Sequence, residues 1–135
     1  MSLQVLLRAA LAAPSKMSCV ILQHGGGVSR EAHAGSCFGC RKWEFSVLFM
    51  ALWDDPSPEA RAANMAWGNR GWDDVYAAGI ATGAYPCDID PRRRPDGARR
   101  EVALQFAPDV LERLRALKWG VDPNGLFRAS WPLSW

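Results

Sequence analysis

Residues 19–27 read Cys-Val-Ile-Leu-Gln-His-Gly-Gly-Gly, residues 45–53 read Phe-Ser-Val-Leu-Phe-Met-Ala-Leu-Trp, and these two stretches decide the fold. The run from Cys19 to Leu22 is short, apolar and rich in β-formers, which predicts a strand that the three glycines end. Two further strands are predicted over 37–42 and 45–53, because too few residues separate them to hold a helix. The sequence therefore predicts a three-stranded antiparallel meander.

Two helices are predicted around these strands. Residues 5–13 carry apolar side chains near helical spacing, and Pro14 ends the pattern. The triplet Ser57-Pro58-Glu59 combines a capping hydroxyl, a proline at the first helical position and an acid near the positive end of the helix dipole. A helix is therefore expected from this triplet to about residue 76. Its expected inner face consists of Ala60, Ala63, Trp67 and Val75.

The second half of the chain is predicted to hold one short strand, one exposed loop and one amphipathic helix. The strand covers 79–85 and the loop covers 91–100. The helix covers 108–118, because its apolar and charged residues fall on opposite faces, and Gly120 and Pro123 are expected to end it. The predicted fold class is α+β: a mostly antiparallel sheet with helices packed on one face, followed by a C-terminal helix and tail, in a single domain over 1–135.

Composition excludes several classes of protein. With 49% apolar and 22% charged residues, the 135-residue chain has the composition of one globular domain and not of a disordered, collagenous or membrane-spanning protein. Its net charge of +2 is far below the surplus of nucleic-acid or anionic-membrane binders, so neither partner is expected. Arg8 interrupts the leucine-rich N-terminus, which favours a first helix over a signal peptide. Four cysteines at irregular spacing indicate a reducing compartment, hence the cytoplasm.

Two short motifs could carry chemistry. His24-Gly25-Gly26-Gly27 matches the tetrapeptide with which some esterases present amides to an oxyanion, but the chain has no nucleophile elbow. We therefore interpret it as a turn whose glycines allow a positive φ and close backbone approach. Cys37 and Cys40 have the spacing of redox dithiols and zinc knuckles. A predicted strand would point the two thiols to opposite faces, and no second ligand pair follows, so buried structural thiols and no metal are expected.

Arginines and tryptophans are further candidates for a ligand-binding site. The five arginines of 91–100 could clamp a phosphate, although a solvated turn is the favoured interpretation of a charge cluster in a Pro/Gly loop. Seven tryptophans are many for this length. Those at 43, 53 and 67 are expected in the core, while Trp131 and Trp135 are expected to cover an apolar surface; an aromatic-lined ligand pocket stays open as an alternative.

Several fragments, in the right order over most of the chain, resemble the C-terminal part of berberine-bridge-enzyme-like FAD-linked oxidases, a branch of the vanillyl-alcohol oxidase superfamily. The closing signature is the most specific. Residues 113–118 are similar to the family's Arg-Leu-x-x-hydrophobic-Lys, and residues 121–128 are similar to its Tyr-Asp-Pro-x-Asn-x-Phe ending. The other matching fragments are Leu22 to Arg30, Cys37 to Arg41, Trp53 to Pro56, Ala66-Trp67, and Gly83-Ala84-Tyr85 leading to Asp90.

The resemblance implies a portion of a flavoenzyme. Residues 14–90 would belong to the substrate domain whose sheet covers the flavin, and 91–135 would be the C-terminal segment that packs back on the FAD-binding domain. The whole enzyme would oxidise an alcohol or amine C–H of a small molecule and pass the electrons from FAD to O2. This chain contains no glycine-rich nucleotide-binding segment. It is therefore expected neither to hold FAD nor to be active alone, and an FAD-binding domain or subunit is the expected partner.

The resemblance also assigns candidate site residues. Tyr85, Cys87 and Asn124 would face the cofactor. Cys87 and Asp88 stand where the family has Asn and Tyr, and a tyrosine is the base in several members. Asp88 is thus a candidate base if burial raises its pKa, although a solvated turn aspartate is the favoured interpretation.

Two alternatives concern the state of the chain. A free-standing, non-catalytic α+β binding or interaction module would keep the fold and lack the flavin. If the resemblance holds, a homodimer is the favoured expectation, because the face bearing Tyr85 and the tail would be apolar over more area than a monomer tolerates. The alternative is a monomer whose C-terminal tail folds back over its own sheet.

Overall fold

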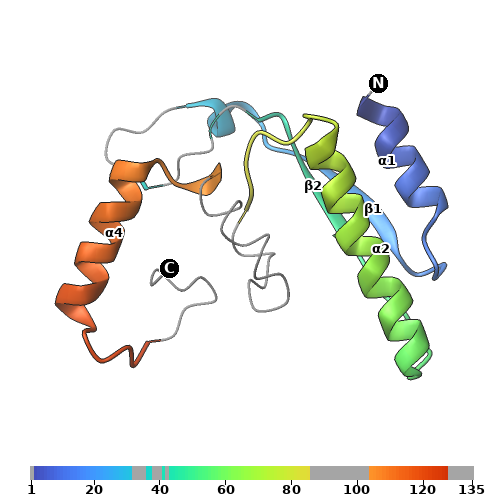
Figure 1. Ribbon diagram of the computed structural model, residues 1–135. Coiled ribbons are helices and arrows are strands. Elements are labelled where there is room, and N and C mark those ends of the chain that lie inside the picture. The colour runs from blue at the N-terminus through green and yellow to red at the C-terminus, as the bar shows by residue number, and fades with distance from the viewer. Residues whose placement is uncertain (1, 32–35, 38–40, 42, 86–103, 128–135) are drawn as a thin grey trace. The chain divides into compact units, whose positions relative to one another are not determined.

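The sheet consists of two antiparallel strands, β1 (Cys19–His24) and β2 (Phe45–Met50), which pair from Cys19↔Met50 to His24↔Phe45 (Figure 1). The computed structural model describes residues 2–31, 36–37, 41, 43–85 and 104–127. These residues fall into two compact units, one made of 1–30 and 43–81 and the other of 31–42 and 82–135. The sheet, helix α1 (Ser2–Leu11) and helix α2 (Pro58–Ala77) belong to the first unit, and helix α4 (Pro108–Val121) belongs to the second.

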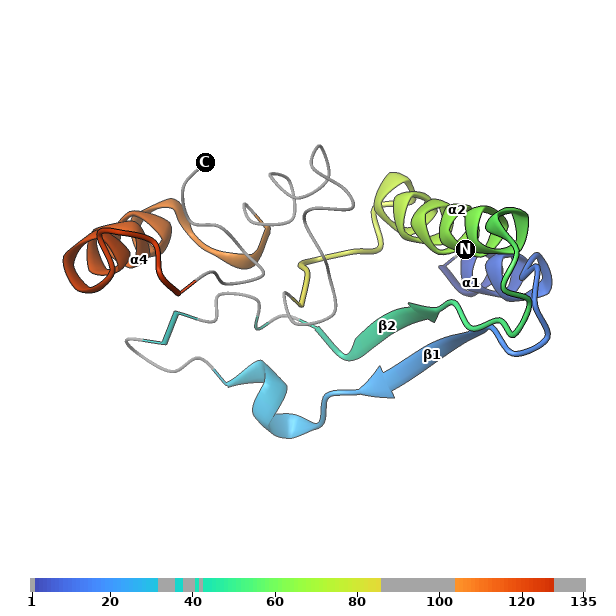
Figure 2. The same ribbon diagram turned by 90° about the horizontal axis from the view of Figure 1, so that it is seen from below.

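One face of the sheet packs on helices. Successive side chains of a strand alternate between faces, so Phe49 shares its face with its strand partner Val20, and with Leu22 and Val47. Phe49 makes an edge-to-face contact with Trp67 of α2, with ring centroids 6.1 Å apart. Figure 2 shows α1 and α2 on the same side of the two strands. The predicted layering of helices on one sheet face is thus confirmed for this unit.

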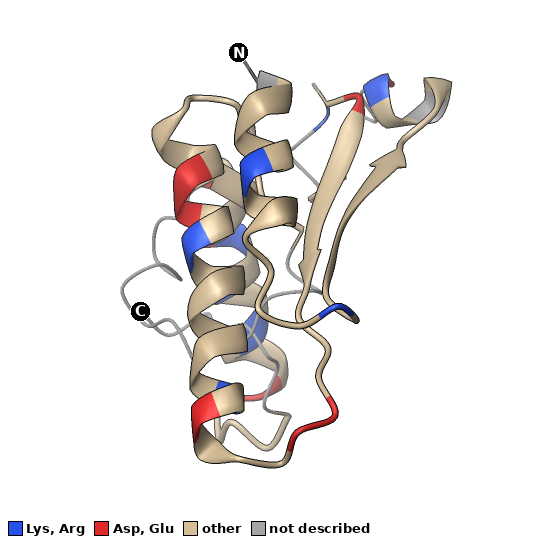
Figure 3. Ribbon diagram, turned by 90° about the vertical axis from the view of Figure 1, so that its right-hand side faces the viewer, with Lys and Arg blue, Asp and Glu red and all other residues tan. Residues whose placement is uncertain are grey.

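The other sheet face carries Cys19, Ile21, Leu48 and Met50, and neither α1 nor α2 lies over it. Both strands also lack Asp, Glu, Lys and Arg, whereas α2 carries charges along its length (Figure 3).

Helix α2 (Pro58–Ala77) begins where the capping triplet predicts. Ser57 is the N-cap in an extended conformation, and its Oγ accepts a hydrogen bond of 3.2 Å from the Ala60 amide. At the other end Gly79 has a φ of +66°, a conformation that glycine adopts without strain. The buried face consists of Asn64, Trp67, Gly71 and Val75. The predicted inner face is therefore right at Trp67 and Val75 and wrong at Ala63, which is exposed.

Helix α1 (Ser2–Leu11) confirms the predicted first helix, and the chain leaves it before Pro14. Leu6 is buried, and the indole Nε1 of Trp67 donates a 2.7 Å hydrogen bond to the Ala9 carbonyl. That carbonyl lies in the last turn of α1 and also accepts a 3.2 Å hydrogen bond from the Ala12 amide, so Trp67 adds a second, long-range hydrogen bond at the end of the helix.

A buried polar network closes the same unit. Asn64 is 3% exposed; its amide nitrogen donates to the Ala60 carbonyl at 2.9 Å, and its Oδ1 lies 3.1 Å from the Ser18 hydroxyl. Ser18 also accepts a hydrogen bond from the Leu52 amide at 3.0 Å. The residues just before β1 and just after β2 are thereby tied to α2 through one side chain.

Helix α4 (Pro108–Val121) confirms the predicted amphipathic helix and extends it by about one turn. Gly120 does not end it, because an exposed helical glycine costs only about 1 kcal/mol relative to alanine. The α+β class is confirmed by the two strands together with these helices.

Three strand predictions need correction. The strand over 45–53 ends at Met50. Residues 80–85 form no strand, because the Ile80 amide still bonds the Val75 carbonyl and the chain then runs without ladder partners. Over 37–42 the described residues Cys37 and Arg41 are not in a strand, and the other positions lie outside the described residues, as do the loop 91–100 and the tail tryptophans. Among the described helices none is long and apolar enough to cross a lipid bilayer.

Candidate functional site

The turn after β1 uses its own amides for structure. The Gly25 amide donates to the Glu44 carbonyl at 2.9 Å, and the Gly26 amide donates to Nδ1 of His24 at 3.1 Å. Ser29, in the 3-10 helix η1 (Gly27–Arg30), is buried, and its hydroxyl lies 2.8 Å from the Gly26 carbonyl. Two of the glycine amides already donate hydrogen bonds within the turn, so they are not free to stabilise an oxyanion. The structure therefore does not support the esterase interpretation.

The glycines of this turn are required by geometry. Gly26 has a φ of +73°. A Cβ at Gly25 would lie 2.4 Å from the Trp43 ring and 2.8 Å from Cβ of Ser29, so a side chain cannot be accommodated there. The prediction of a turn with a positive φ and close backbone approach is confirmed.

The cysteine motif differs from its prediction. Cys37 is an exposed free thiol and not a buried one, since it lies at a bend and not in a strand. Cys40 lies outside the described residues. Cys19 is likewise an exposed free thiol. Among the described residues no three His, Cys, Asp or Glu side chains cluster as metal ligands would.

The candidate cofactor residues fall in the second unit. Tyr85 follows the buried Ala84 and is 51% exposed. Asn124 lies in the turn after α4 and is exposed. Cys87 and Asp88 lie outside the described residues, so their assignments stay predictions.

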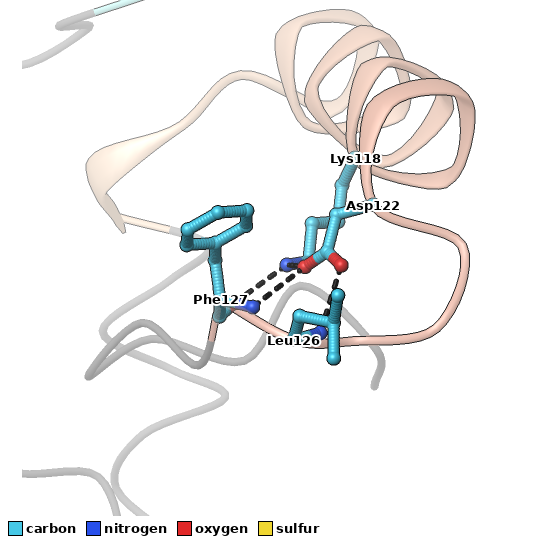
Figure 4. Close-up of polar contacts among 4 residues, drawn as sticks. All are labelled: Lys118, Asp122, Leu126 and Phe127. Carbon is cyan, nitrogen blue, oxygen red and sulfur yellow. Dashed lines mark hydrogen bonds and ion pairs between the residues drawn. The ribbon is translucent and has the colours of Figure 1, made fainter.

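A set of polar contacts that the sequence reasoning missed fixes the turn around Asn124 (Figure 4). We call it the clasp: Lys118, Asp122, Leu126 and Phe127. The Asp122 carboxylate accepts hydrogen bonds from the amides of Leu126 at 2.8 Å and Phe127 at 3.0 Å. The Lys118 ammonium donates to the same carboxylate and, at 2.6 Å, to the Phe127 carbonyl. The spacing Lys-x-x-x-Asp at a helix end was the available signal, because residues four apart share a helix face.

Asp122 is held in its ionised form. Asp122 is only 6% exposed. The hydrogen bond from Lys118 lowers the pKa of the Asp122 carboxyl most, and burial opposes this effect. The amides of Leu126 and Phe127 and the charge of Lys118 lower the pKa further. The clasp therefore keeps an ionised carboxylate that accepts three hydrogen bonds at the base of the turn.

Gly125 completes the turn with a φ of +63°, and its amide donates to the Asp122 carbonyl at 3.1 Å. In the family ending Tyr-Asp-Pro-x-Asn-x-Phe, the Asn falls on position 125 and not on 124. Asn is the non-glycine residue that tolerates a left-handed conformation best. The geometry thus explains why Asn or Gly suits position 125, and Asn124 does not occupy the place of the family's Asn.

The N-termini of α2 and α4 are poorly suited to a dinucleotide pyrophosphate. Such a group binds amides at a helix N-terminus, where a nearby acidic side chain would repel it. The first turn of α2 contains Glu59 and its cap is the Ser57 hydroxyl, while the first turn of α4 contains Asp109. Tyr85 and Asn124 stay predicted contacts of a flavin ring.

The class of protein follows from comparison with known sequences: the chain is similar to part of an FAD-linked oxidoreductase. The relative is the FAD-linked oxidoreductase aurO of Gibberella zeae, 31% identical over 117 residues. The alignment covers 86% of this chain and 21% of the relative, so the chain spans about a fifth of that protein's length. No protein-family model matches the chain. No solved structure matches it either.

Proposed function

We propose that this chain is the substrate-side, flavin-covering portion of an FAD-dependent oxidoreductase of the berberine-bridge-enzyme-like type. The whole enzyme would oxidise the C–H beside an alcohol or amine of a small molecule, with O2 as acceptor. The observation that carries the proposal is the similarity to an FAD-linked oxidoreductase along 86% of the chain. The proposal places the enzyme in the cytoplasm.

The described residues support a role in covering the flavin ring and not a role in binding the pyrophosphate of FAD. Tyr85 and Asn124 expose an aromatic ring and a primary amide, groups suited to stacking and hydrogen bonding against a flat polar ring. The clasp fixes the turn that carries Asn124. The acidic first turns of α2 and α4 disfavour a pyrophosphate, so an FAD-binding domain or subunit would bind that group. Asp88 is the candidate base for the substrate proton.

A chimera tests this proposal. The segment of aurO that aligns with this chain is replaced by residues 1–135, and the flavin content of the purified protein is measured from its visible absorbance. We expect the chimera to bind flavin and this chain alone to purify colourless. A chimera that folds, as judged by circular dichroism, and contains no flavin would contradict the proposal.

Point variants in the same chimera test the two residues. Tyr85→Leu and Asn124→Ala are expected to shift the visible bands or weaken flavin retention several-fold. Tyr85→Phe keeps the ring, and Pro123→Ala changes an exposed neighbour in the turn, so both controls should behave like the parent. Equal spectra for all four variants would remove Tyr85 and Asn124 from the flavin site.

A further inference from the structure

The outer edge of β1 presents a row of backbone groups to a partner. Because the Gly25 amide bonds the Glu44 carbonyl, the pair 25↔44 is a hydrogen-bonded pair of the antiparallel ladder. Such pairs alternate along the ladder, so Cys19, Ile21 and Gln23 direct their backbone groups toward β2. The backbone groups of Val20 and Leu22 face away from β2. No strand among the described residues pairs with them.

The amino-acid sequence of β1 does not block pairing at this edge. Charged side chains, prolines and bulges usually block pairing between edges, and β1 contains none of them. β1 is also the more open of the two strands: four of its six residues are exposed, against one of six in β2. Leu22 is 48% exposed although it lies on the helix-packed face.

The backbone groups and apolar side chains of this edge determine which kind of partner fits it. A row of amides and carbonyls at a two-residue repeat is satisfied by another extended backbone, and the flanking Val20, Ile21 and Leu22 require apolar neighbours. β1 itself meets both requirements. A two-fold axis at Ile21 pairs each Val20 with Leu22 of the copy, places Ile21 beside Ile21, and sets Cys19 against Gln23. The alternative register, with Leu22 on the axis, would set His24 against Val20 and pair a polar residue with an apolar one.

We propose that the outer edge of β1 is a self-association site, at which two copies of the chain form a continuous four-stranded antiparallel sheet through β1. The interface is isologous, as in most homodimers. This inference does not depend on flavin chemistry. It rests on the ladder geometry, the uncharged strand and the exposure of β1.

Cross-linking at the axis tests the register. All four native cysteines are replaced by Ser, and Ile21→Cys is introduced. Non-hydrogen-bonded partners lie about 4.5 Å apart at Cα, within disulfide range, so mild oxidation should give a covalent dimer. The matched control is Leu48→Cys, which shares the sheet face and half-buried state of Ile21 but would lie about three strand spacings, roughly 14 Å, from its copy. It should stay monomeric on a non-reducing gel.

Sedimentation equilibrium of the unmodified chain gives the second readout. A concentration-dependent dimer is expected, and Leu22→Lys should weaken its association at least tenfold without changing the circular dichroism spectrum. A monomer at every concentration would overturn the proposal. A dimer that Leu22→Lys leaves intact, or that cross-links equally through Leu48→Cys, would overturn it as well.

Discussion

The first unit and the clasp are each stabilised by hydrogen bonds, but the bonded residues are far apart in the sequence in the first unit and close together in the clasp. In the first unit, decisive hydrogen bonds join residues 46 and 58 positions apart, Ser18 to Asn64 and Trp67 to Ala9. In the clasp, each hydrogen bond spans nine residues or fewer. Long-range contacts form only when the whole unit folds, whereas a local turn can open by itself. Substitutions in the first unit should therefore change global unfolding, and substitutions in the clasp should change local order.

The largest expected effect is that of Trp67→Ala. The side chain is 8% exposed, packs on Phe49 and donates a hydrogen bond to the Ala9 carbonyl, so its removal leaves a cavity and deletes that hydrogen bond. We expect a loss of about 3–5 kcal/mol in the free energy of unfolding, measured by urea denaturation. Trp119→Ala is the control, because Trp119 is 68% exposed, and it should stay within about 0.5 kcal/mol of the parent. Similar losses for both variants would refute the proposed core.

Two glycines of α2 separate packing from helix propensity. A Cβ at Gly71 would lie 2.5 Å from the Phe49 ring, while a Cβ at Gly68 meets nothing within 4 Å. Gly68→Ala should stabilise the protein by roughly 0.5–1 kcal/mol, because alanine favours the helix. Gly71→Ala gains the same propensity but overpacks the contact between α2 and β2, and a net loss of about 1–2 kcal/mol is expected. If thermal unfolding showed Gly71→Ala to be as stabilising as Gly68→Ala, the packing of α2 on β2 would be wrong.

The clasp should open at acid pH. The pKa of the Asp122 carboxyl is lowered in the folded state, chiefly by the hydrogen bond from Lys118. A depressed pKa means that the stabilisation is complete above the ordinary aspartate value of about 3.9 and is lost as pH falls through the folded value below it. The amide resonances of Leu126 and Phe127 should report this transition by NMR.

Variants at Lys118 check the cause of that shift. Lys118→Met should raise the midpoint of the amide transition, and Lys118→Arg, which keeps a cationic donor, should raise it less. An unchanged midpoint in Lys118→Met would show that the two backbone amides alone hold the carboxylate.

The smallest expected effect concerns Gly125, whose φ is +63°. Gly125→Ala should destabilise the turn by roughly 1 kcal/mol, and Gly125→Asn by less, because Asn tolerates the left-handed region better. Hydrogen exchange of the Leu126 amide measures this locally. If the Leu126 amide were equally protected in both variants, backbone conformation would not explain why the Tyr-Asp-Pro-x-Asn-x-Phe ending has Asn at this position.

The sequence predicted those elements whose signals are local. The capping triplet at Ser57, the apolar spacing of α1 and α4, and the glycine turn after β1 all depend on residues within a few positions, and all four are confirmed. The strand over 79–85 is wrong because small alternating residues make a strand only beside a partner. The inner face of α2 is wrong at Ala63 because the buried Asn64 becomes acceptable only through Ser18, 46 residues away.

The candidate site was less accessible to sequence reasoning. Lys118 and Asp122 were not predicted as a pair, because surface Lys-x-x-x-Asp spacings are common and only burial of the carboxylate makes this one important. Tyr85 and Asn124 came from a family resemblance and not from any local signal, and a position-by-position comparison with Tyr-Asp-Pro-x-Asn-x-Phe places the Asn of that ending at position 125 and not at Asn124.

The most direct test of the central claim is a flavin fluorescence titration. The part of aurO outside the aligned segment is prepared with FAD, and this chain is added at increasing micromolar concentration. We predict a saturable change in flavin emission that reaches its end point at one chain per flavin and is lost with Tyr85→Leu. Flavin emission that stays constant throughout the titration, with both proteins folded, would contradict the assignment of this chain as the flavin-covering portion.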